Sequence, residues 1–328
     1  MRPFAFARAA DVPAAVAATA QPGTALIAGG TELVNWMKEG IVVPTRLVDI
    51  NGLTELAAID ADPRGLRIGA LARMSDVAEH EAVRRDFPAI AEALERSASP
   101  QLRNMASMGG NLMQRTRCPY FRAETDLPCN KRRPGTGCAA LEGEDRSMAI
   151  FGWSEHCLAT HPSDVAVALA ALDAVVHVRN TFGTRQVALV DFYQLPGNAP
   201  ERDSVLHAGE IIAAIEVPAS PLAKRSHYLK VRERASYEFA LVSAAVAVEL
   251  DGKRIRQAHI ALGGVAPKPW RLTRAEGALA GGSLETSTLR TALEESFAEA
   301  KPRRHNGFKI ELAKRAVIRA LQTAGEKA

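Results

Sequence analysis

The chain has 328 residues, of which 47% are hydrophobic and 24% are charged, with a formal net charge of +4 at pH 7. This composition is typical of a globular protein with two or three subdomains, and it excludes a disordered chain. The small charge, without basic runs interleaved with aromatic residues, gives no support for nucleic-acid binding.

The sequence predicts neither a membrane span nor a signal peptide. No apolar stretch approaches the roughly 18 uncharged residues that a spanning helix needs. The N-terminal segment contains Arg2, Arg8 and Asp11 and lacks a continuous apolar core. Export would therefore depend on a partner that carries a signal.

Residues 24–38 predict a strand, a glycine turn and a helix. The apolar run over 24–28 is typical of a buried strand, Gly29 and Gly30 interrupt it, and an amphipathic pattern follows over 31–38. Such a unit offers backbone N–H groups and a helix N-terminus to a phosphate. The same pattern also fits ordinary turn chemistry, and it is not a G-x-G-x-x-G motif.

The other elements before residue 220 follow from apolar periodicity and turn residues. Strands are expected over residues 41–50, 66–71, 174–179 and 210–218, and helices over residues 12–20, 75–81, 88–97 and 164–172, with Ser75 as an N-cap.

Composition changes at Pro218 to Pro221, where we place a domain boundary. Beyond it, Asp251-Gly252 predicts a two-residue hairpin turn, and Pro267, Pro269 and Trp270 are expected to end the sheet. The strands of this sheet are predicted over residues 227–232, 239–250 and 255–262, and the amphipathic helices that would cover its one packed face over residues 286–300 and 308–321.

All four cysteines lie within residues 118–157, in a segment that begins as a Pro- and Gly-rich loop. Cys118, Cys129, Cys138 and Cys157 are separated by ten, eight and eighteen residues. Two disulfides, a zinc site, unrelated buried thiols and an iron–sulfur cluster are all compatible with this pattern. An iron–sulfur cluster is favoured, because a chain of this length needs no disulfides and a zinc site would usually include a closely spaced cysteine pair.

Several cations surround these cysteines and would stabilise an anionic cluster, although a solvated basic loop explains them equally well. They are Arg115, Arg117, Arg122, Lys131, Arg132 and Arg133.

Three segments, residues 26–33, 106–112 and 162–164, together resemble the flavin-binding motifs of molybdenum hydroxylase medium subunits. This family includes the FAD subunits of xanthine dehydrogenase, carbon monoxide dehydrogenase and aldehyde oxidoreductases. The resemblance implies an α+β fold. A PCMH-type, two-subdomain FAD-binding domain would span residues 1–220, and a C-terminal α+β domain like that of the carbon monoxide dehydrogenase flavoprotein would span residues 221–328.

The cysteine segment looks most like the FAD/[4Fe-4S] subunit of bacterial periplasmic aldehyde oxidoreductases. Most flavin subunits of the family lack these cysteines, and the benzoyl-CoA-type reductases arrange their insertion differently. The resemblance implies that all four cysteines bind a [4Fe-4S] cluster in a loop over about residues 115–160.

The resemblance also implies the FAD-binding residues, with the first glycine segment around the pyrophosphate. By position they are Leu26, Ile27, Ala28, Gly29, Gly30, Thr31, Glu32, Leu33, Ser107, Gly110, Asn111, Asp164, Ile212 and Lys230. From the residues alone, Asp164 could equally cap the helix that it begins. Ile212 and Lys230 carry no signal of their own.

The activity that the resemblance implies is electron transfer within a heterotrimeric aldehyde oxidoreductase. A molybdenum-cofactor large subunit would oxidise the aldehyde, a small subunit with [2Fe-2S] clusters would pass on the electrons, and FAD here would deliver them to an external acceptor. No catalytic residue is predicted, because the chain lacks a Ser-His-Asp arrangement or a metal-activated water signature. The expected compartment is the periplasm, by co-export, or the cytoplasm.

Two other functions stay open. One is a stand-alone FAD oxidase of the vanillyl-alcohol-oxidase type, which would usually have a substrate-binding cap domain. The other is a non-flavin metal-cluster module that rests on the cysteine loop alone.

Overall fold

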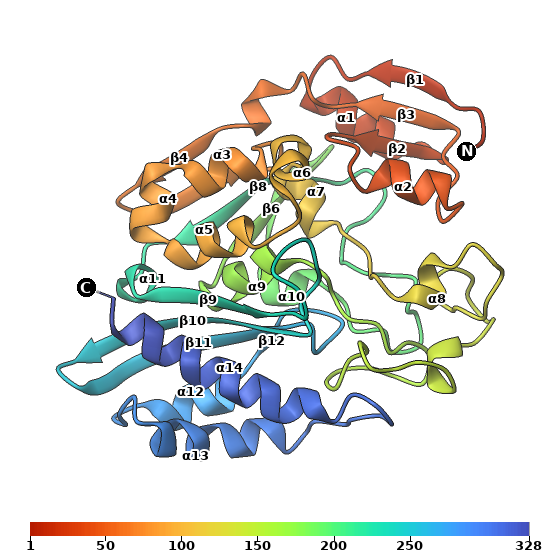
Figure 1. Ribbon diagram of the computed structural model, residues 1–328. Helices are drawn as coiled ribbons and strands as arrows, with labels where there is room; N and C mark the ends of the chain where they lie inside the picture. Colours follow the sequence, from red (N-terminus) through yellow and green to blue (C-terminus); the bar gives the residue numbers. More distant parts are fainter. Residues whose placement is uncertain (328) are drawn as a thin grey trace.

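Three β-sheets follow one another through the molecule, with helices packed between and beside them (Figure 1). The computed structural model describes residues 1–327. The strands are β1 Ala5–Arg8, β2 Thr24–Ile27, β3 Arg46–Asp49, β4 Ile59–Asp62, β5 Gly65–Gly69, β6 Val175–Asn180, β7 Gly183–Ala188, β8 Ile211–Pro218, β9 Ser226–Val231, β10 Val242–Asp251, β11 Arg254–Gly263 and β12 Trp270–Arg271.

The helices are mostly short. They are α1 Val12–Thr19, α2 Leu33–Lys38, α3 Met74–Glu79, α4 Glu81–Asp86, α5 Pro88–Glu95, α6 Pro100–Met105, α7 Met108–Leu112, α8 Pro119–Arg122, α9 Asp164–Ala171, α10 Leu189–Phe192, α11 Pro221–Lys224, α12 Thr273–Leu279, α13 Thr286–Phe297 and α14 Phe308–Gly325, with 3-10 turns η1 Thr54–Leu56 and η2 Ala139–Leu141. Within residues 1–327, no helix combines the length and apolar character needed to cross a bilayer.

The first sheet is parallel and three-stranded, with the order β1-β3-β2. Helix α1 begins where expected, because the Asp11 carboxylate accepts a hydrogen bond from the Ala14 N–H at 2.8 Å. Strand β2 and helix α2 confirm the predicted strand–turn–helix unit. The strand expected over 41–50 forms only at Arg46–Asp49, beyond Pro44, which has no N–H to donate to a ladder.

The second sheet is antiparallel and five-stranded, with the order β4-β5-β8-β6-β7. Strands β5, β6 and β8 confirm three predicted strands, and helices α5 and α9 confirm two predicted helices. Ser75 is not an N-cap: α3 begins one residue earlier, with Arg73 at the N-cap position. The reason is tertiary, because the Met74 N–H donates to the Ala106 carbonyl at 3.0 Å.

The third sheet, β12-β11-β10-β9, departs from the prediction at its turn and at its end. Asp251 pairs with Arg254, so the hairpin turn is Gly252-Lys253, and Gly252 supplies the positive φ that such a turn requires. Trp270 does not end the sheet but begins β12, because it pairs with Leu262 of β11.

Both faces of the third sheet are covered, where only one covered face was expected. Along β10, Val246 and Val248 enter the core shared with α12, α13 and α14, whereas Ala245 and Ala247 enter the core shared with α5 and α9. Alternate residues of a strand point to opposite faces, so the small alanines let helices of the preceding part pack closely against the sheet.

The segment between α7 and α9 contains the cysteines and few regular elements, and it projects to the right in Figure 1 around α8. A small core of Ala140, Met148 and Leu158 supports it. The second glycine segment is not an extended loop, because Gly109 and Gly110 lie in α7.

Candidate cofactor-binding site

The two glycine segments lie against each other. A Cβ added to Gly29 would lie 1.9 Å from the backbone oxygen of Met105, which directly precedes the second segment. Only glycine permits this approach. Gly30 follows with a φ of +69°, which lets the chain turn from β2 toward α2.

The turn after β2 presents free hydrogen-bond donors. Within residues 1–327, the backbone N–H groups of Gly29, Gly30, Thr31 and Glu32 donate no hydrogen bond to the protein. Backbone N–H groups left free at a glycine turn before a helix form a natural anion site.

The second segment is fixed from both sides. The Ser107 hydroxyl accepts the Gly110 N–H at 3.2 Å and caps α7, while the Gly109 N–H donates to the Ala70 carbonyl at 2.7 Å. Asn111 accepts a hydrogen bond from Ser163 at 2.5 Å. Because Ser163 is also the N-cap of α9, this bond joins the second predicted motif to the third.

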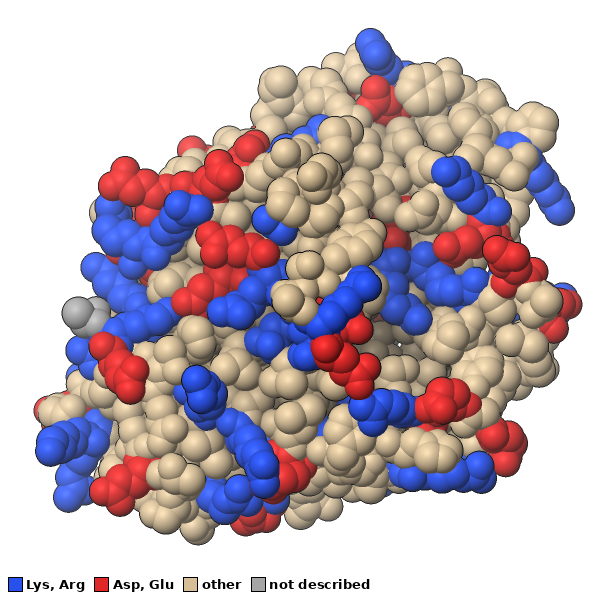
Figure 2. All heavy atoms as spheres, in the orientation of Figure 1, with Lys and Arg blue, Asp and Glu red and all other residues tan. Residues whose placement is uncertain are grey.

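A cavity of about 1490 Å³ opens between these segments. Every predicted FAD-binding residue lines it except Ile27, whose side chain packs against Gly30 instead. The volume exceeds the usual range for drug-sized ligands and suits a dinucleotide. On the face drawn in Figure 2, the surface is hollowed right of the centre, and basic side chains gather beside this hollow.

A buried ion pair forms part of the cavity wall. The Asp164 carboxylate accepts hydrogen bonds from Lys230 at 2.8 Å, from Ser97 at 3.0 Å and from Tyr228. Asp164 therefore does not cap α9, since Ser163 does so. Burial, followed by the neighbouring Asp164 charge, raises the pKa of Tyr228 well above its ordinary value.

The four cysteines line a second, small cavity and are all free thiols. Burial raises the pKa of Cys118 to about 12 and that of Cys157 to about 11. Backbone N–H groups partly oppose this effect, from Phe121 and Tyr120 at Cys118 and from Arg132 and Lys131 at Cys129. Among the described residues, no three of these sulfurs lie within 4.8 Å of one another.

One extended segment separates the two cavities. Arg115 and Arg117 line the larger cavity, whereas Thr116 and Cys118 line the smaller one. Alternate residues of an extended chain point in opposite directions, so this segment is a wall shared by both cavities.

The cations of the cysteine loop do not form a solvated basic face. The side chains of Arg115, Arg122 and Lys131 are only 17%, 15% and 9% exposed, and each is paired with a carboxylate, whereas that of Arg133 is 58% exposed. Lys131 lines the thiol cavity, and its charge acts to lower the pKa of Cys129 and Cys157.

Comparison with known families accounts for this geometry. A model described as the FAD binding domain in molybdopterin dehydrogenase matches residues 2–220, and one described as the CO dehydrogenase flavoprotein C-terminal domain matches residues 227–324. The chain belongs to the FAD-binding subunits of the molybdopterin dehydrogenase family. The predicted family and the α+β fold are thereby confirmed, and the chain is part of an oxidoreductase family.

Relatives of this FAD-binding subunit cover most or all of its length. The aldehyde oxidoreductase FAD-binding subunit PaoB of Escherichia coli (strain K12) is 48% identical and covers 100% of both chains. The glyceraldehyde dehydrogenase medium chain of Sulfolobus acidocaldarius is 26% identical over 84% of this chain and 80% of its own. The structure of quinoline 2-oxidoreductase from Pseudomonas putida 86 superimposes with a TM-score of 0.77 at 23% identity, over 99% of this chain and 98% of that chain.

Tyr228 and Ser97, the two other side chains that bind Asp164 in this FAD-binding subunit, were not predicted from the sequence. A sequence signal exists for Tyr228 but not for Ser97. Tyr228 lies two positions before Lys230 on β9, so strand alternation places both on the same face. Ser97 follows α5 and carries no local signal that it meets Asp164.

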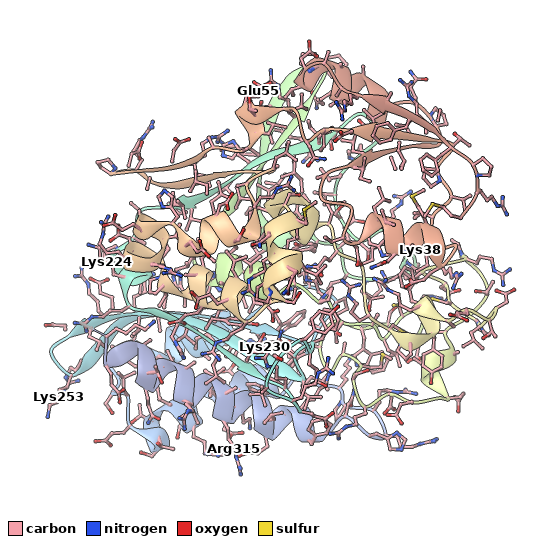
Figure 3. All side chains as sticks on the ribbon, turned by 45° about the horizontal axis from the view of Figure 1, so that its top comes forward. Lys38, Glu55, Lys224, Lys230, Lys253 and Arg315 are labelled. Carbon is pink, nitrogen blue, oxygen red and sulfur yellow. The ribbon has the colours of Figure 1, made fainter. Side chains whose placement is uncertain are left out.

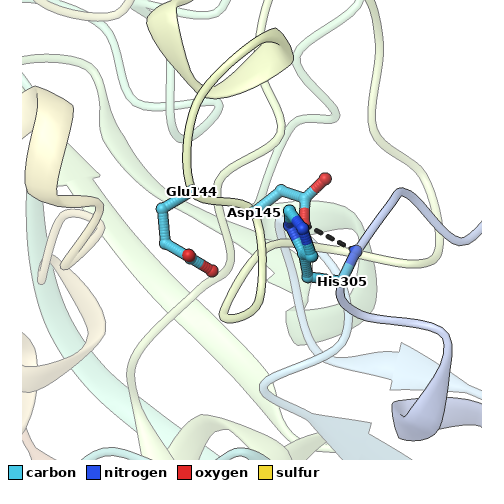
Figure 4. Close-up of side chains that lie close together, drawn as sticks. All are labelled: Glu144, Asp145 and His305. Atoms are coloured by element: carbon cyan, nitrogen blue, oxygen red, sulfur yellow. Dashed lines mark hydrogen bonds and ion pairs between the residues drawn. The ribbon is translucent and has the colours of Figure 1, made fainter.

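Glu144, Asp145 and His305 form a third cluster of possible metal ligands, and hydrogen bonds within the protein account for its central carboxylate (Figure 4). Asp145 is 2% exposed, and its carboxylate accepts the backbone N–H groups of Arg304 and His305 at 3.0 and 2.9 Å. Its oxygens are therefore already used to join the cysteine loop to the segment before α14.

Proposed function

We propose that this chain is the FAD- and [4Fe-4S]-containing electron-transfer subunit of a molybdenum-dependent aldehyde oxidoreductase. The observation that carries the proposal is the shared wall of residues 115–118, with the glycine-turn cavity on one side and a cavity lined by all four cysteines on the other. The 48% identity to an aldehyde oxidoreductase FAD-binding subunit supports the aldehyde as the substrate of the whole complex.

The larger cavity suits FAD in both its volume and its donors. The free N–H groups at Gly29 to Glu32 match the charge of a pyrophosphate, and the two glycines permit the tight turn that leaves these groups free. Ser107, Gly110 and Asn111 would contact the same cofactor from α7. Lys230, held by Asp164, would place a fixed positive charge beside the flavin.

The smaller cavity suits a cluster better than a single zinc ion. Four thiolates around one zinc ion lie about 3.8 Å apart, as follows from a Zn–S distance of about 2.3 Å in a tetrahedron. The sulfurs here are more widely spread than that. An iron–sulfur cluster places its ligands farther apart, and N–H groups directed at the sulfurs are what such a centre requires.

When bound, FAD and the cluster supply the electron-carrying chemistry. The residues of this chain bind these groups, fix their orientation and exclude water from the thiols. No side chain is required as a general base or nucleophile, which agrees with an electron-transfer role.

The partners that we infer are a molybdenum-cofactor large subunit and a [2Fe-2S] small subunit, which with this chain form a heterotrimer. An external acceptor would receive the electrons. This assignment is compatible with two compartments. The complex could lie in the periplasm, after co-export with a signal-bearing partner, or in the cytoplasm.

The assignment is tested by purifying the complex that contains this chain. A flavin absorption band, together with iron and acid-labile sulfide at four per chain beyond those of the partner, is expected. A colourless chain that contains zinc would contradict the proposal and select the non-flavin module. Substrate turnover by the chain without partners would favour the stand-alone oxidase.

The role of the cluster is tested with Cys129→Ser. Loss of turnover in a well-assembled, flavin-containing complex would identify an electron relay. Normal turnover with poor assembly would identify a structural centre, because four bonds across a long loop also order it.

A further inference from the structure

Arginines of the cysteine loop hold both ends of helix α2, which follows the first glycine turn. Arg122 donates to Glu32 at 2.5 Å and to Glu39 at 3.1 Å, and these two residues are the N-cap and C-cap of α2. Arg117 donates to the second carboxylate oxygen of Glu32 at 2.6 Å. Both oxygens of Glu32 are thus bound to the cysteine loop.

Apart from these ion pairs and a hydrogen bond from Arg132 of the same loop to the Glu39 carbonyl at 2.9 Å, helix α2 has few attachments. It contains six residues, of which only Met37 is buried, and Glu32 makes no side-chain capping bond to it. A helix of this length is not stable on its own. The ion pairs are themselves sheltered, since the side chains of Arg122 and Glu32 are 15% and 14% exposed. Removing one partner of such a sheltered pair therefore costs more than removing one partner of an exposed surface pair.

Arg117 lies where a change in the conformation of the cysteine loop would reach the larger cavity. It directly precedes Cys118, and its guanidinium lines the larger cavity and lies 4.8 Å from the ring centroid of Phe239. A second connection runs parallel to it: Asp203 lines the larger cavity and binds both Arg115, at 2.7 Å, and Lys131, at 2.6 Å. Lys131 in turn lines the thiol cavity.

We propose that the cysteine loop positions the first glycine turn for FAD through Arg117 and Arg122, so that FAD affinity depends on metal occupancy of the thiol cavity. This inference rests on the proposed function. Metal bound by four cysteines orders the loop, and the ordered loop fixes Glu32 and with it the free N–H groups of residues 29–32. Glu32 and the two arginines are positioning residues. By linkage, bound FAD favours metal retention to the same extent.

The test uses the purified complex, stripped of FAD and titrated with FAD while the quenching of flavin fluorescence is followed. Arg122→Met is expected to raise the Kd for FAD roughly tenfold, within the usual range for coupled sites. Arg122→Lys should recover only part of this affinity, because an ammonium cannot bind two carboxylates as a planar fork does. The matched control is Arg133→Met in the same loop, whose exposed side chain pairs, among residues 1–327, only with Asp126.

The decisive comparison removes iron with a chelator. In the wild type, iron removal should raise the Kd for FAD and accelerate amide hydrogen exchange over residues 29–39. In the Arg117→Met/Arg122→Met double variant, iron removal should change the Kd much less, because the ion pairs to Glu32 and Glu39 are already broken and only the Arg132 bond and the Asp203 pairs remain. An equal effect of iron removal in both proteins would overturn the inference.

Amide hydrogen exchange of the wild-type complex tests the inference even if the double variant does not fold. Unchanged exchange over residues 29–39 after iron removal would also contradict the inference. A wild-type complex without flavin or iron would instead contradict the proposed function, and this outcome is visible before any variant is compared.

Discussion

The Lys230 ammonium lies 2.8 Å from the Asp164 carboxylate, and the two side chains are only 2% and 7% exposed. Figure 3 shows Lys230 in the interior, between the helices and the third sheet. Lys230 also donates to the Arg96 carbonyl at 3.1 Å. The pair connects β9 to the start of α9, so it ties the C-terminal part of the chain to the FAD-binding part at the wall of the cavity.

Lys230→Met is expected to lower the thermal unfolding midpoint and the flavin content together. The substitution leaves the Asp164 carboxylate buried without a cation. Removing one partner of a buried ion pair in this way lowers the free energy of unfolding by about 3 kcal/mol. The double variant Lys230→Met/Asp164→Asn should recover part of this loss. Lys253→Met at the exposed tip of the β10–β11 hairpin is the matched control (Figure 3). Additive effects of the two interior substitutions would contradict this account.

Gly29→Ala is expected to abolish stable flavin binding and to destabilise the fold. The new Cβ would lie 1.9 Å from a backbone oxygen of Met105, so that one of the two glycine segments must move away from the other. The flavin-to-protein absorbance ratio and the thermal midpoint measure both effects. Gly52→Ala, where an added Cβ would meet no atom beyond the adjacent residues within 4 Å in the described part of the chain, should change neither. A flavin-replete Gly29→Ala protein would show that contact between the segments is not needed.

Elements with strong local signals were predictable from the sequence. Asp11 caps α1, and the apolar run before Gly29 forms β2, because capping and strand periodicity depend on neighbouring residues. The failures depend on distant residues. Trp270 became part of a strand through pairing with β11, and the start of α3 was set by the Ala106 carbonyl rather than by Ser75.

The candidate site also contains parts that could be predicted from local sequence patterns and parts that depend on distant residues. The glycine segments and the four cysteines carried their own patterns, and the structure gathers them around two cavities. Their connections could not be predicted: Arg122 meets Glu32 across 90 residues, and Lys230 meets Asp164 across 66. No local pattern encodes which charge is paired with which after folding.

Acid should weaken a specific contact at the cavity wall. Arg185 binds both oxygens of Glu210, at 2.8 and 2.7 Å, and this bond lowers the pKa of Glu210 to about 2. The folded protein thus binds fewer protons than the unfolded chain between this pKa and the ordinary value of 4.5. The stabilisation is complete above that ordinary value and is lost as the pH falls toward about 2.

Glu210→Gln should therefore lower the free energy of unfolding by about 1 kcal/mol near neutral pH. The expected loss is this small because Arg185 is partly exposed, and solvent weakens its attraction to Glu210. The difference in free energy of unfolding from the wild type should shrink as the pH falls below about 4.5, which urea titrations at several pH values measure. Glu55→Gln, at an exposed position in η1, is the control (Figure 3). A difference that is independent of pH would show that ionised Glu210 is not responsible.

Lys309 is expected to be a main attachment of the cysteine loop to the C-terminal helix. Its side chain is 1% exposed, and its ammonium donates to the carbonyls of Ser147, Met148 and Gly264 at 2.8, 3.0 and 2.8 Å. Lys309→Met would leave the Ser147 and Gly264 carbonyls without this donor, whereas the Met148 carbonyl still accepts from the Asn306 amide at 3.2 Å, and the substitution should destabilise the protein by about 2 kcal/mol. Arg315→Met on the outer face of the same helix α14 should be nearly neutral, since that side chain is 71% exposed (Figure 3). Thermal unfolding, with limited proteolysis over residues 113–160, measures both variants. Equal stability of the two would show that the loop is held elsewhere.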